Sequence, residues 1–103
     1  MASYVFAYKG GRMADTDEER AAAMAAWGRW FEELGSAVVD GGNPFAGAAS
    51  VKAGGVSQGG ESGLTGYSIV SADTLDGAAS LAKGCPILGN GGSIEVYEVM
   101  PVM

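Results

Sequence analysis

Near the start of the chain, the side chains of residues 3–9 follow the two-residue repeat of a β-strand. Both faces of this strand are apolar, with Tyr4, Phe6 and Tyr8 on one side and Val5 and Ala7 on the other. A glycine pair at 10–11 ends the segment. A strand with two apolar faces predicts a sheet that is covered on both sides.

A helical pattern follows, from about residue 17 to residue 34. The segment from Thr16 to Glu19 resembles a capping box, and its acidic side chains complement the positive end of a helix dipole. Apolar residues at helical spacing then form one broad arc that would lie on a sheet: Met24, Trp27, Trp30, Phe31 and Leu34. Gly35 is suited to end the helix in a left-handed conformation.

Four further strands, one of them weak, and a second helix are predicted after this helix. Residues 37–39 favour a strand, and the glycine-rich stretch 40–66 favours a long connection with one weak strand over residues 50–53. Residues 67–72 predict the next strand, and about residues 93–100 predict the last.

The second helix would begin at a cap formed by Asp73 or Thr74 and run to about residue 83. Gly84 can end it, and Pro86 prevents its return. Its apolar residues are available for packing: Leu75, Ala78, Ala79, Leu81 and Ala82.

This order of elements predicts one α+β domain over residues 1–103, a ferredoxin-like split βαβ antiparallel sheet with two helices on one face. Apolar residues remain for a second face: Tyr4, Phe6, Tyr8, Tyr67 or Val70, and Tyr97 or Val99. Two helices cannot cover both faces. We therefore expect a homodimer joined through the uncovered face, because burying that face removes apolar area from water.

Charge and composition restrict the partners of this domain. The net charge is −6, and the six basic residues are scattered, which argues against a nucleic acid or an anionic membrane as partner. No apolar stretch reaches the roughly 18 to 20 residues of a membrane span, and no signal-peptide pattern is present. A single cysteine cannot form an internal disulfide, so we expect a cytoplasmic protein.

Several segments together resemble the YCII-related family, in the branch named for its Asp-Gly-Pro-Phe motif. They are the opening strand with the helix ending in Trp27 to Leu34, the Ser71 to Asp76 segment, the Gly84-Cys85-Pro86 turn, and the closing strand over Gly91 to Val96. The resemblance implies a dimeric α+β barrel with a pocket, suspected to be enzymatic, near the dimer interface.

The chain departs from this family pattern at two points. The segment Asp40-Gly41-Gly42-Asn43-Pro44-Phe45 does not contain the namesake motif, and no other copy exists. The histidine and aspartate pair proposed as catalytic in some YCII proteins is impossible, because the chain has no histidine. We assign no catalytic residue, and we expect no cofactor and no metal.

Six residues are candidates for ligand contacts: Tyr4, Tyr8, Arg20, Asp40, Tyr67 and Glu95. The tyrosines could line an apolar pocket and offer hydroxyl groups, or could belong to the sheet and dimer core. Arg20 lies in the apolar arc of the first helix. It could bind an anion between the helix start and the sheet, or pack its stem on Trp27 while its head reaches solvent or a carboxylate.

The two carboxylates and the thiol also have alternative roles. Asp40 could be a general base or ligand acceptor at the sheet edge, or could form a turn with its own backbone. Glu95 and Glu98 would point to opposite faces of the last strand, because they are three positions apart. Glu95 could do acid–base work beside a buried Tyr97, or could face solvent or the dimer rim. Cys85 would follow a helix C-terminus, which opposes a thiolate, so we expect it to pack rather than react.

The leading hypothesis is a homodimeric domain that binds a small molecule in a cavity near the sheet or dimer interface. Arg20 and the tyrosines would make its polar contacts. One alternative is a cofactor-independent enzyme of the small monooxygenase or isomerase type, which uses Asp40 or Glu95. Another is a structural or partner-binding domain, in which the glycine-rich residues 41–66 form the contact surface.

Overall fold

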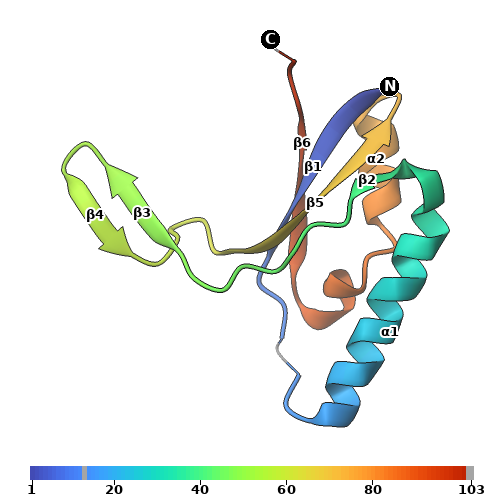
Figure 1. Ribbon diagram of the computed structural model, residues 1–103, viewed down its shortest axis with the longest axis horizontal. Helices are drawn as coiled ribbons and strands as arrows, with labels where there is room; N and C mark the ends of the chain where they lie inside the picture. The colour runs from blue at the N-terminus through green and yellow to red at the C-terminus, as the bar shows by residue number, and fades with distance from the viewer. Residues whose placement is uncertain (13, 102–103) are drawn as a thin grey trace.

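The structure, a computed structural model, describes residues 1–12 and 14–101 (Figure 1). In chain order the helices and strands are β1 (Ala2–Lys9), α1 (Asp17–Leu34), β2 (Val38–Asp40), β3 (Ala49–Lys52), β4 (Gly55–Gln58), β5 (Leu64–Ala72), α2 (Leu75–Ala82) and β6 (Ser93–Glu98). Two short 3-10 helices, η1 (Gly35–Ala37) and η2 (Pro86–Asn90), precede β2 and β6.

Four of the strands form an antiparallel sheet in the order β2-β5-β1-β6. Both α1 and α2 lie on one side of this sheet (Figure 1). Because β1 is a central strand, its residues Tyr4 to Lys9 pair on both sides: Val5 lies opposite Ile69 and Tyr97, and Phe6 lies opposite Ser68 and Val96. The predicted ferredoxin-like α+β arrangement is confirmed.

The core lies between the sheet and the helices. Tyr4, Phe6 and Tyr8 are buried there with Trp30, and the Phe6 and Trp30 rings stack with centroids 6.1 Å apart. Val70 also belongs to this core. The prediction that the three β1 aromatics belong to a second apolar face was wrong, because the helices cover them. Of the alternatives Tyr67 and Val70, Val70 is buried in the core and Tyr67 is not.

The other face of the sheet has no helix over it among the described residues (Figure 1). Since side chains alternate along a strand, this open face carries Val5 and Ala7 from β1, Tyr67 and Ile69 from β5, and Tyr97 from β6. Tyr97 is 55% exposed, and the Tyr67 ring stacks on Phe45 at 5.9 Å. We call this surface the open sheet face.

Threonine caps begin both helices as predicted. The Glu19 N–H donates to Thr16 Oγ1 at 3.0 Å, and the Gly77 N–H donates to Thr74 Oγ1 at 2.9 Å. The bounds of α1 match the prediction, and Gly35 ends it with a φ of +56°. Within the described ranges, neither helix has the length and apolar character needed to cross a membrane.

The expectations for Met24 and for Gly84 were wrong, and three predicted element ends differ from the structure by one or two residues. Met24 is 75% exposed, because the first half of α1 extends past the end of the sheet (Figure 1). The α2 helix ends at Ala82, and Gly84 has no positive φ; a Cβ there would lie 3.2 Å from Trp30 Cδ1, so its small size serves packing. The second strand begins at Val38 after η1, and β6 stops at Glu98.

The weak strand predicted in the glycine-rich connection is present as β3, and it forms a hairpin with β4, which was not predicted. β3 and β4 pair only with each other, separately from the four-stranded sheet. The hairpin extends away from the body of the domain on the left of Figure 1. The alternation in β4 is too short and too polar to be recognised beside so many glycines.

Candidate functional site

A cavity of about 740 Å³ opens between α1, the Gly41–Pro44 loop and the start of β5. Its volume falls in the range that holds a small molecule. The cavity brings together three of the six candidate residues, Tyr8, Arg20 and Tyr67. It lies between helix and sheet, because residues of α1, β1 and β5 all line it.

Aromatic rings from β1 and α1 form one wall. Tyr8 and Trp27 meet edge to face with centroids 5.1 Å apart, and Trp27 lies 6.0 Å from the ring of Phe31. Trp27 also meets Trp30 at 5.7 Å, and Trp30 is fixed because its Nε1–H donates to the Leu81 carbonyl at 3.1 Å. These contacts hold the apolar wall in place without a ligand.

A chain of hydrogen bonds runs behind the floor of the cavity. The Tyr8 hydroxyl donates to Ser68 Oγ at 2.7 Å, and the Ser68 hydroxyl donates to the Gly41 carbonyl, also at 2.7 Å. Burial raises the pKa of Tyr8 to about 12, and this exceeds the opposing effect of the Ser68 hydrogen bond. Tyr8 is thus a neutral donor at physiological pH, and its proton is already engaged.

The loop opposite α1 is held by Asp40 and by a glycine that has no room for a side chain. The Gly42 N–H donates to Asp40 Oδ1 at 2.8 Å, which is the turn-forming arrangement weighed for Asp40. Gly42 has a φ of +72°, and a Cβ there would lie 1.8 Å from the Tyr67 carbonyl oxygen. The carboxylate of Asp40 is exposed and does not line the cavity, but it fixes the loop that does.

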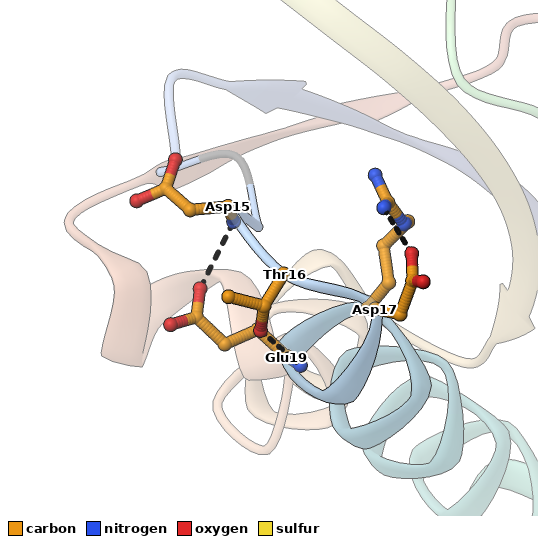
Figure 2. A network of polar contacts seen from close by, with 5 residues as sticks. Asp15, Thr16, Asp17 and Glu19 are labelled. Atoms are coloured by element: carbon orange, nitrogen blue, oxygen red, sulfur yellow. Dashed lines mark hydrogen bonds and ion pairs between the residues drawn. The ribbon is translucent and has the colours of Figure 1, made fainter.

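Arg20 lines the cavity with its side chain 60% exposed, so it lies where the cavity opens to solvent. Polar side chains at the start of α1, among them Asp15, Asp17 and Glu19, lie close by in sequence (Figure 2). The Arg20 Nη2 is 2.6 Å from Asp17 Oδ1, and both side chains are well exposed. Beside this pair, Glu19 accepts the Asp15 N–H at 3.0 Å (Figure 2). The predicted capping box is thus modified, since its carboxylate reaches Asp15 in place of the backbone of Thr16.

The remaining candidates lie elsewhere. Tyr4 is buried in the core and does not line the cavity, and Glu95 is on the open sheet face. There the Tyr97 hydroxyl donates to Glu95 Oε1 at 2.8 Å, and Lys9 Nζ lies 3.9 Å from Glu95 Oε2. Tyr67 lines the cavity, yet strand alternation directs its ring to the open sheet face.

The single thiol is buried and does not line the cavity. Burial raises the pKa of Cys85 to about 11, against a smaller opposing effect of its hydrogen bond with the Ile87 backbone. A neutral buried thiol agrees with the packing role expected for it. Across residues 1–12 and 14–101, no three side chains of the metal-binding types gather into a site.

Sequence reasoning missed Trp27 and Phe31 as cavity residues, and it missed the Gly41–Pro44 loop. The two aromatics occur in the apolar arc of α1, which indicates core packing equally well. Nothing in their spacing shows that a cavity separates this part of the helix from β5. Asp40 followed by two glycines was the one local signal for the loop.

Comparison with known proteins gives one match. The family model of the YCII-related domain matches residues 1–103. No curated protein matches the chain. No solved structure matches it either.

Proposed function

The chain belongs to the YCII-related family, and on this basis we propose that it is a homodimeric domain that binds a small molecule between α1 and the Gly41–Pro44 loop. The observation that carries the proposal is the cavity itself, whose wall of Tyr8, Trp27 and Phe31 is already packed. A preformed apolar pocket with few polar groups is the usual form of a small-molecule site.

The chemistry of the wall favours a ligand with a flat apolar part and an acidic group. The rings of Trp27 and Phe31 suit the apolar part, and Arg20 at the mouth suits the acidic group. Arg20 is engaged only with the exposed Asp17 among the described residues. An exposed ion pair contributes little, so a ligand anion can compete for the guanidinium at small cost.

A binding test with 2-naphthoate, which has both features, addresses this proposal. The naphthoate should raise the melting temperature and quench tryptophan fluorescence, since Trp27 lines the cavity. Arg20→Ala should weaken binding about fivefold, the equivalent of roughly 1 kcal/mol for a charged contact at an open mouth. Arg29→Ala is the matched control, because Arg29 is exposed on the same helix and does not line the cavity.

Equal binding by wild type and Arg20→Ala would remove Arg20 from the site. If wild type binds neither 2-naphthoate nor other aromatic acids, the proposed ligand class is wrong. The enzyme alternative receives less support. It requires Asp40 or Glu95 beside the cavity, and neither lines it.

The proposed homodimer would use the open sheet face. Val5, Ile69 and Tyr97 are neighbours across β5, β1 and β6, and none is covered by a helix of its own chain. Burying this apolar surface against a second copy would remove it from water. The resemblance to dimeric α+β barrels points to the same arrangement.

Sedimentation velocity of wild type and Ile69→Asp tests the dimer. A dimer in the wild type and a monomer in Ile69→Asp would support it, and a wild-type monomer at 0.1 mM or more, roughly tenfold above the Kd of a weak dimer, would overturn it. Leu75→Asp is the matched control, because Leu75 is an exposed apolar residue on α2, on the opposite side of the sheet. Circular dichroism confirms that each variant is folded.

A further inference from the structure

We infer that the β3–β4 hairpin is an arm that packs its apolar face against a second copy of this chain. This inference rests on the homodimer proposed above and adds a second contact surface to it. We define the arm as residues 49–61, and its apolar face as the side that carries Val51 and Val56.

The arm has little contact with the rest of its own chain. Its strands pair only with each other, and Figure 1 shows it extending from the body of the domain. The radius of gyration is 14.9 Å, whereas a compact domain of 100 residues has about 13 Å. A two-stranded hairpin is marginally stable alone, so an arm of this kind gains stability from a surface that covers it.

The two faces of the arm differ in character. Val51 and Val56 lie directly opposite each other, and they are 75% and 73% exposed. On the other face the Ser50 hydroxyl donates to the Gly59 carbonyl and accepts the Glu61 N–H, while Lys52 and Glu61 form an ion pair at 2.8 Å. The polar face is therefore internally satisfied, and the apolar face has no partner among the residues of its own chain that the structure describes.

The position of the arm favours a second copy as its partner. In Figure 1 the helices lie to the right of the strands and the arm extends to the left, on the side that the helices leave open. A copy seated on the open sheet face would therefore lie beside the arm. By two-fold symmetry its own arm would reach back in the same way, so each chain would hold the other.

The size of the open sheet face supports the same occupant. Four strands of about six residues cover roughly 400 Å² in projection, so the accessible surface of this face only approaches the roughly 800 Å² that each partner of a typical stable complex buries. The sheet face alone is small for a lasting dimer. Two arms, one from each chain, would add the missing apolar area.

Charge also permits this contact, although the chain carries a net charge of −6. Lys52 and Glu61 on the arm neutralise each other, as Lys9 and Glu95 do on the open sheet face. Half of the twelve acidic residues lie instead in α1 or just before it. Two acidic copies can therefore meet through these surfaces without facing like charges there.

The test compares wild type with the double variant Val51→Ser and Val56→Ser by sedimentation equilibrium. The dimer dissociation constant should rise at least about tenfold, because four valines per dimer would lose their apolar contacts. Ser57→Ala is the matched control, since Ser57 pairs with Ser50 on the polar face. It should leave the constant unchanged.

A mixed dimer with one isotope-labelled copy gives the second readout. Val51 and Val56 methyl groups should show nuclear Overhauser contacts to the unlabelled copy. A dimer with an unchanged constant in the double variant and no such contacts would overturn the arm while leaving the homodimer intact. A wild-type monomer would overturn both proposals.

Discussion

The Tyr8 hydroxyl donates a 2.7 Å hydrogen bond to Ser68 Oγ, from β1 to the neighbouring strand β5. The Ser68 hydroxyl in turn donates a hydrogen bond to the carbonyl oxygen of Gly41. The floor of the cavity and the loop at its rim are thus joined through one buried serine. Removal of either hydroxyl should change both the free energy of unfolding of the domain and the position of the loop.

Tyr8→Phe removes this hydrogen bond while keeping the ring against Trp27. We expect a loss of about 1 kcal/mol in the free energy of unfolding, which corresponds to a fall of about 4–8 °C in melting temperature. Tyr4→Phe is the matched control, because Tyr4 is equally buried in β1 and its hydroxyl has no hydrogen-bond partner in the described ranges. Thermal unfolding by circular dichroism measures both, and equal losses would contradict the assigned role of the Tyr8 bond.

Trp30 and Trp27 should respond differently to the same substitution. Trp30 is buried and donates to the Leu81 carbonyl, so Trp30→Phe should cost about 1–3 kcal/mol of stability. Trp27 is partly exposed at the cavity, so Trp27→Phe should cost less and should remove most of the fluorescence quenching by 2-naphthoate. Urea unfolding followed by fluorescence titration separates the two effects. Reversed results would mean that Trp30, rather than Trp27, faces the ligand.

The main elements of the fold could be predicted because each has a local physical signal. The span of α1 follows from its threonine cap and from Gly35, and β1 follows from its two-residue repeat. The direction of the β1 aromatics could not be predicted. Both faces of β1 are apolar in the sequence, and only the placement of Trp30 above Phe6 decides which face the helices cover.

The candidate site was predictable only in part, for a related reason. Tyr8, Arg20 and Tyr67 do line one cavity, but Tyr4 and Glu95 lie outside it. The alternation of side chains along a strand shows which residues share a face of the sheet. It does not show where the sheet ends under a helix. The cavity lies between α1 and residues of β1 and β5, so its position depends on tertiary packing.

Gly42→Ala should be far more harmful than Gly41→Ala, although the two glycines are adjacent. A methyl group at 42 would lie 1.8 Å from the Tyr67 carbonyl oxygen, and Gly42 has a φ of +72°. We expect a loss of about 3 kcal/mol or more, or displacement of the loop from β5. A methyl group at 41 meets nothing within 4 Å, so that variant should be neutral or slightly stabilising. Chemical unfolding measures the pair, and similar values would show that the loop is held more loosely than this geometry implies.

Alkaline pH should destabilise the domain, because folding raises the pKa of Cys85 and of three tyrosines, Tyr4, Tyr8 and Tyr97, with the largest shifts at Cys85 and Tyr8. The pKa of Cys85 rises from 9.0 to about 11 on folding, and that of Tyr8 from 10.0 to about 12, in both cases mainly through burial. A raised folded-state pKa means that the unfolded chain loses its proton first. The stability contributed by each neutral group is therefore complete below its unfolded pKa, and it is lost as pH rises through the folded value.

Urea unfolding should give a constant stability up to about pH 9 and a decline between about pH 9 and 12. Cys85→Ala should remove the part of the decline that begins near pH 9, and Tyr8→Phe the part between about pH 10 and 12. A decline of the same shape in both variants and the wild type would assign the alkaline transition to other groups.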